Sequence, residues 1–249
     1  MRIQLHGRFT IEIGGHPVDQ QLPGRRARLL VAYLASHSHT PAERGSLIDM
    51  LWLPGQPGPG AAASFAALLS KTRRVLAPAE IAGRASLQLL LPTGTLVDTD
   101  RATAALHDAH GATAAGDWRR AWTQALSAVF ITQREFLPEF DTDWVHQLRA
   151  RSRRLHQDAT ACYAQACLEL GGAELPSAER CARRLIDTDP LAERGYHLLM
   201  RALAGRGDHG AALQVYQQLR GTLREELGAS PSPTLAELHV RLLRGGRPG

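Results

Sequence analysis

Residues in the second half of the chain recur at a fixed offset, and this recurrence constrains the fold more than any other feature. Three residues return 34 positions later: Ala178 as Ala212, Ala182 as Tyr216, and Leu185 as Leu219. The tract 115–118 (Ala-Gly-Asp-Trp) is echoed at 206–209 (Arg-Gly-Asp-His). Small residues where two helices cross, Gly-Asp at the turn and a period of 34 are typical of tetratricopeptide helical hairpins. The alternative is a plain helical bundle; in either case the pattern is helical from Asp98 to the end.

The first 97 residues begin with a different periodicity. Residues 2–13 alternate apolar and polar side chains, which predicts a strand. Gly14-Gly15 then predicts a hairpin turn into a second short strand near Val18. From Arg25 the apolar residues follow helical spacing, so the first helix is expected to begin there.

Two further helices and a pair of strands are predicted before residue 98. Thr40 is expected to be the N-cap, and Pro41 the first residue, of a helix that runs through Trp52. Residues 54–60 are expected to form a Pro/Gly-rich loop. A helix over 61–76 follows, and 81–91 and 95–97 are expected to be strands around the turn 92–94. The order is that of a winged helix with an N-terminal sheet. The chain is therefore expected to be mainly α, with an α+β winged helix-turn-helix domain at 1–97 and an all-α repeat domain at 98–249.

The formal charge of the chain is concentrated in its first third. Residues 1–96 contain ten basic and five acidic side chains, whereas the remainder carries nineteen of each sign. Every base in 1–96 except Lys71 is an arginine, the better partner for phosphates and guanine edges. A basic small domain joined to a neutral larger one indicates a polyanion-binding domain. A solubilising surface charge is the alternative reading.

The helix over 61–76 is the predicted DNA-recognition helix. Its apolar stripe leaves a slim outward face of Ala63, Ala67 and Ser70 that fits a major groove, with basic residues at the end of the helix. Arginines at the start of the first helix and on the wing are expected to add phosphate contacts. The predicted DNA-binding residues are Arg25, Arg26, Ser64, Ala67, Ser70, Lys71, Arg73, Arg74 and Arg84.

Other classes of site find no support in the sequence. The three cysteines, at 162, 167 and 181, form no CxxC pair, and no phosphate loop, HExxH or GxSxG motif occurs. We therefore expect no catalytic residue, no metal site and no cofactor. Residues 1–13 alternate apolar and polar side chains and no apolar run is long enough to cross a bilayer, so no signal peptide is expected. A cytoplasmic, nucleoid-associated protein without membrane contact is therefore expected.

Five stretches in order along residues 1–244 resemble the Streptomyces antibiotic regulatory protein family. Its members join an OmpR-like winged helix to a bacterial transcriptional activator domain built on tetratricopeptide-like repeats. The matching stretches are 25–30 (RRARLL), 47–52 (LIDMLW), 69–76 (LSKTRRVL), 135–140 (EFLPEF) before 143–145 (DWV), and 223–228 (LREELG) with 231–233 (PSP). The fourth stretch is the hallmark of the activator domain. The resemblance implies double-stranded promoter DNA, RNA polymerase and a second copy of the chain, in a homodimer, as partners.

The chain departs from the family pattern at two places that concern DNA. The wing of relatives carries Gly-Gly-Tyr where residues 83–87 are Gly-Arg-Ala-Ser-Leu, and the first half of the recognition helix, 61–67, is mostly alanine. Alanine contacts a thymine methyl but cannot hydrogen-bond to a base edge. Two hypotheses follow: a promoter-binding transcriptional activator, or a protein–protein adaptor whose winged helix no longer recognises DNA sequence.

Overall fold

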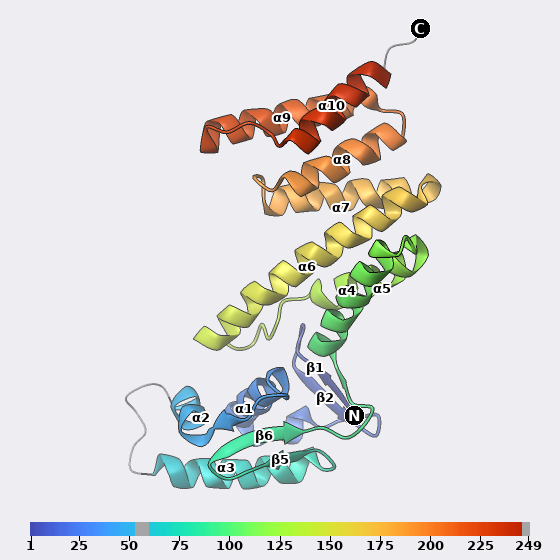
Figure 1. Ribbon diagram of the computed structural model, residues 1–249. Helices are drawn as coiled ribbons and strands as arrows, with labels where there is room; N and C mark the ends of the chain where they lie inside the picture. The colour runs from blue at the N-terminus through green and yellow to red at the C-terminus, as the bar shows by residue number, and fades with distance from the viewer. Residues whose placement is uncertain (53–59, 246–249) are drawn as a thin grey trace. The chain divides into compact units, whose positions relative to one another are not determined.

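The computed structural model describes residues 1–52 and 60–245, and the predicted loop at 54–60 lies almost wholly outside them. The chain forms two units, which are described separately. The first contains residues 1–101 and 131–152, and the second contains 102–130 and 153 to the end. The structure is mainly helical with a small N-terminal sheet region, as the sequence predicts (Figure 1).

The first unit carries all the strands of the described residues. Its elements are β1 (Arg2–Gln4), β2 (Thr10–Ile13), β3 (His16–Pro17), α1 (Gly24–Ser36), β4 (Ala42–Glu43), α2 (Arg44–Leu51), α3 (Ala61–Leu76), β5 (Glu80–Ala82), β6 (Ser86–Leu90) and β7 (Leu96–Val97), with the start of α4 (Asp98–Ala114), the end of α5 (Trp118–Thr132) and the first part of α6 (Asp143–Leu170). One sheet has the order β3-β2-β1-β7 and the other β4-β6-β5.

The N-terminal sheet corrects one prediction and confirms another. Residues 2–13 do not form one strand, because the chain reverses at Gly7 and β1 pairs antiparallel with β2, with Ile3 opposite Ile11. The turn at Gly14-Gly15 is confirmed: both glycines have positive φ, 59° and 82°, as a tight hairpin requires. Strand β7 joins this sheet by pairing in parallel with β1.

The helix start predicted at Thr40-Pro41 is wrong. Residues 42 and 43 form β4, in which Glu43 lies opposite Ser86 of β6, and α2 begins only at Arg44. Long-range strand pairing outweighs the local N-cap pattern here.

The expected hairpin around 92–94 is also wrong. Residues 81–91 contain a turn of their own, so β5 pairs antiparallel with β6, with Ile81 opposite Leu89. β7 pairs with β1 rather than with β6. The hairpin β5–β6 is therefore the wing.

A single core holds the first unit together, and it includes residues remote in sequence. Phe9, Leu30 and Phe65 are fully buried, as are residues of the stretch that resembles the activator-domain hallmark. We call residues 135–145 the hallmark segment; its buried members are Phe136, Leu137, Phe140 and Val145. The predicted division at 97/98 stays a prediction, but the packing of 131–152 assigns the hallmark segment to the first unit.

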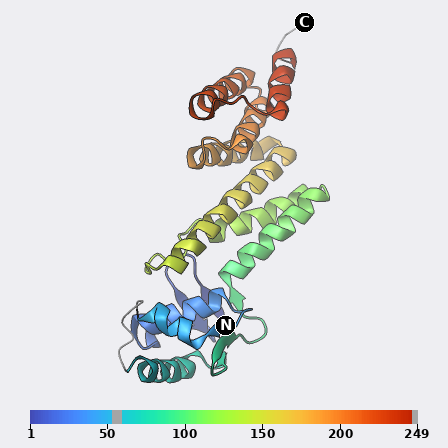
Figure 2. The ribbon, with the colours of Figure 1, turned by 60° about the vertical axis from the view of Figure 1, so that its left-hand side comes forward.

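The second unit is a stack of helices. After the remaining parts of α4, α5 and α6 come α7 (Leu175–Thr188), α8 (Glu193–Gly205), α9 (His209–Leu227) and α10 (Pro233–Gly245). Neighbouring helices pack in sequence order from α7 to α10, as both views show (Figures 1 and 2). The repeated residues Ala178, Ala182, Ala212, Tyr216 and Leu219 are buried on α7 and α9, as equivalent positions of a helical repeat require.

Candidate nucleic-acid interface

Helix α3 has the bounds predicted from the sequence and two chemically different faces. Phe65, Leu69 and Leu76 are buried in the core, together with Thr72, whose hydroxyl donates a hydrogen bond to the Leu68 carbonyl. The exposed face is small and uncharged in its first half and basic in its second half, and it consists of Ala62, Ala63, Ser64, Ala66, Ala67, Ser70, Lys71 and Arg74. Five predicted DNA-binding residues thus share one exposed surface of α3: Ser64, Ala67, Ser70, Lys71 and Arg74.

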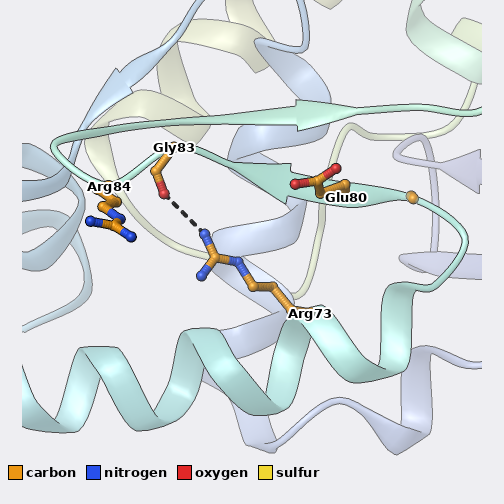
Figure 3. Close-up of a pocket in the computed structure, with 5 residues that line it drawn as sticks. Arg73, Glu80, Gly83 and Arg84 are labelled. Atoms are coloured by element: carbon orange, nitrogen blue, oxygen red, sulfur yellow. Dashed lines mark hydrogen bonds between the residues drawn. The ribbon is translucent and has the colours of Figure 1, made fainter.

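Arg73 is placed differently from its neighbours. Its Nε donates a hydrogen bond to the Ile81 carbonyl at 2.8 Å. A terminal nitrogen donates a second one to the Gly83 carbonyl at 3.1 Å (Figure 3). Both acceptors belong to the wing. The side chain of Arg73 therefore ties α3 to the wing through the fixed fork of its guanidinium.

The wing turn depends on Gly83. Its φ is +96°, and a Cβ at this position would lie 1.9 Å from the Ser86 carbonyl oxygen. Arg84 follows it, exposed at the turn. Arg73 and Arg84, together with Ala79, Glu80 and Gly83, line an open pocket between the end of α3 and the wing (Figure 3). Two guanidinium groups make this pocket electropositive, with Glu80 as the opposing charge.

Arg25 and Arg26 belong to a different set of contacts at the start of α1. Arg25 donates to the Glu139 carbonyl at 3.0 Å, and Arg26 donates to the Leu51 carbonyl at 3.2 Å. Their guanidinium groups also lie over the rings of Phe140 and Trp52, at 5.8 and 4.8 Å from the centroids. These two predicted residues are engaged in packing within the unit, whereas Lys71, Arg74 and Arg84 have no ion pair or hydrogen bond among the described side chains.

Sequence reasoning missed two residues of this unit. Glu139 binds Arg28 and lies over a hundred positions beyond α1, so nothing in the local pattern indicated it. The sequence shows Arg44 only as one of the bases of residues 1–96, whereas the structure places its backbone beside the wing and its guanidinium beside Phe65 of α3. Its place at the start of α2 became visible only once β4 was known.

Within 1–52 and 60–245 no group of three or more His, Cys, Asp or Glu side chains is arranged to hold a metal ion. No helix of these residues is long and apolar enough to span a membrane.

Comparison with known proteins agrees with this architecture. The family model of the bacterial transcriptional activator domain matches residues 97–243. The regulatory protein AfsR of Streptomyces griseus is 32% identical over 232 residues, which are 93% of this chain but 23% of that protein. The transcriptional regulatory protein MoaR1 of Mycobacterium tuberculosis is 26% identical over 96% of this chain and 78% of its own length. The chain belongs to the Streptomyces antibiotic regulatory protein family.

Other members of the family extend well beyond the matched part. The chain spans less than a quarter of the length of the AfsR proteins. Mycobacterium tuberculosis EmbR, solved in complex with a low-affinity phosphopeptide, has the same fold, with a TM-score of 0.82 at 24% identity over the whole of this chain and 66% of that chain. EmbR thus has the same fold as this chain although only about a quarter of the aligned residues are identical.

Proposed function

We propose that this chain is a DNA-binding transcriptional activator rather than an enzyme, and that it binds promoter repeats through α3 and the wing. The observation that carries the proposal is the exposed face of α3, where a slim first half precedes Lys71 and Arg74. A slim helix face fits the major groove, and unpaired cations beside it bind the phosphates that flank the groove. Arg84 at the wing turn adds a further phosphate or minor-groove contact.

The roles of the remaining predicted residues follow from their contacts. Arg73 acts by fixing the wing against α3, so that the two DNA-contacting elements keep one spacing. Arg25 and Arg26 stabilise the start of α1 and contribute mainly to the electrostatic potential of the unit.

The second unit is proposed to mediate self-association into a homodimer and contact with RNA polymerase. A stack of helical hairpins presents an extended surface for such partners, and a dimer matches repeated half-sites on DNA. The proposal places the protein in the cytoplasm, associated with the nucleoid. Light scattering of the full chain, alone and with a bound duplex, tests the dimer.

The decisive experiment is DNA binding across a salt series. Duplexes covering the region around the protein's own gene are titrated with the full chain and with the double variant Lys71→Ala/Arg74→Ala. We expect one fragment to bind tightly, with the double variant binding more weakly and with a salt slope smaller by about 0.9 for each lost phosphate contact. A matched control is Arg119→Ala/Arg120→Ala, which removes two exposed charges of the second unit.

The alternative function is a protein–protein adaptor, and one observation favours it. Among the exposed residues of the first half of α3, only Ser64 offers a hydrogen-bonding side chain. An adaptor would bind all fragments equally weakly and would respond alike to the α3 and the control double variants. That result would contradict the first proposal and leave the helical repeats as the binding part of the molecule.

A further inference from the structure

The first half of α3 lacks the side chains that distinguish one base pair from another. Between Ala61 and Ala67 the exposed positions are occupied by alanine and Ser64. A helix with this face enters the major groove closely, but it cannot form the bidentate hydrogen bonds that identify guanine or adenine. Sequence recognition at this end of the helix therefore needs a donor from a neighbouring element.

Arg44 is positioned to be that donor. It is the first residue of α2, and its backbone N–H donates a hydrogen bond to the Ala85 carbonyl in the wing turn at 2.9 Å. Its guanidinium carbon lies 4.9 Å from the ring centroid of Phe65, a fully buried residue in the second turn of α3. Arg44 is thus fixed at its backbone to the wing and at its side chain to the alanine-rich half of α3.

The guanidinium of Arg44 has no hydrogen-bond acceptor within residues 1–52 and 60–245. Arg25, Arg26 and Arg28 also lie over aromatic rings, but each of them donates a hydrogen bond to a carbonyl or carboxylate of the same unit. Among the residues that the structure describes, none accepts a hydrogen bond from the Arg44 guanidinium or forms an ion pair with it. The contact with the Phe65 ring holds the guanidinium beside the first half of α3 while its donors remain available.

We propose that Arg44 is a specificity-determining residue that recognises a guanine in the major groove, supplying the base contact that the alanine face of α3 cannot make. The inference rests on the proposed DNA-binding function. A guanidinium held by a ring matches the paired O6 and N7 acceptors of guanine, the geometry that arginine reads best.

The test is a comparison of sequence selection by variants of the full chain. A pool of duplexes with a randomised central region is selected by the wild type and by Arg44→Ala and Arg44→Lys. We expect the wild type to prefer guanine at one position of its site, and both variants to lose roughly five- to a hundredfold in that preference while other positions are retained. Lysine keeps the charge but not the planar fork, so retained affinity with lost preference identifies a base contact.

The controls separate this inference from the proposed function and from unfolding. Arg8→Ala removes one exposed charge from the turn between β1 and β2, and it should leave the selected sequence unchanged. Thermal denaturation confirms that each variant is folded at the temperature of the assay.

If the wild type selects no sequence, the proposed function fails. If the wild type selects a site and Arg44→Ala selects the same one, or loses affinity equally for all duplexes, Arg44 does not recognise a base and this inference is overturned.

Discussion

A terminal nitrogen of Arg28 lies 2.6 Å from the carboxylate of Glu139, which joins α1 to a segment 111 residues further along the chain. The second oxygen of the same carboxylate accepts a hydrogen bond from the backbone N–H of Phe9 at 3.3 Å, and the Glu139 backbone carbonyl accepts one from Arg25. The hallmark segment thus contacts both the N-terminal sheet and the helix that supports α3. Within this segment Leu137 is held at φ +45°, a strained backbone conformation that buried packing maintains.

Glu139→Ala is expected to destabilise the first unit. The change leaves the guanidinium of Arg28 and the N–H of Phe9 without their acceptors in a half-buried site, at a cost of about 1–3 kcal/mol. Urea unfolding followed by the fluorescence of the tryptophans measures it. Glu12→Gln on β2 removes one carboxylate from the same unit as a control. Equal midpoints for the two variants would show that the contact contributes nothing to stability.

The sequence was sufficient where local periodicity determines the structure. The helix 61–76 was predicted with both its bounds, since its apolar residues mark one continuous stripe and a Pro/Gly-rich stretch precedes it. The predictions failed where pairing between distant strands decides: β4 interrupts the expected start of α2, and β7 pairs with β1 rather than with β6. No periodicity within a short window contains that information.

The candidate site likewise combines features that local periodicity predicts with contacts that depend on the tertiary structure. Exposure of Ala67, Ser70 and Arg74 on one face followed from helical spacing alone. The contacts of Arg73 with the wing and of Arg44 with Phe65 did not, because both depend on how the hairpin β5–β6 lies against α3 and α2. The charge of an arginine can be predicted from the sequence, but the atoms that it contacts are determined by the tertiary structure.

Gly83→Ala is expected to disrupt the wing. A methyl group at this position would meet the Ser86 carbonyl oxygen at 1.9 Å and would also force alanine into positive φ, at a combined cost of more than about 2 kcal/mol. Gly94→Ala is the matched control, because Gly94 has a φ of +80° with nothing within 4 Å of the added Cβ, so only the backbone term of about 1 kcal/mol applies. Thermal unfolding ranks the two. A Gly94 variant as unstable as the Gly83 variant would contradict the steric argument.

Cys167 is expected to resist alkylation in the folded protein. Burial raises the pKa of its thiol to about 12, against the influence of hydrogen bonds from Tyr163 and Trp122. The reactive thiolate is therefore almost absent at pH 8. Peptide mapping after a short exposure to iodoacetamide should find Cys167 unmodified in the native chain and modified in urea. Rapid labelling of native Cys167 would show that the second unit opens around it.

The second unit is expected to lose stability as the pH falls below the ordinary pKa of histidine, about 6.5. Burial of His197, with Arg201 and Arg241 nearby, lowers its pKa in the folded state. Between the folded and unfolded pKa values the unfolded chain binds more protons, so acidification favours unfolding, while the full stability is present above pH 6.5. Urea denaturation followed by circular dichroism at pH 8 and pH 5.5 measures the loss.

The variant His197→Gln has no titratable group at this position and should lose less stability than the wild type. The control His107→Gln, at an exposed position of α4, should behave as the wild type does. Identical losses in all three proteins would exclude His197 as a source of the pH dependence.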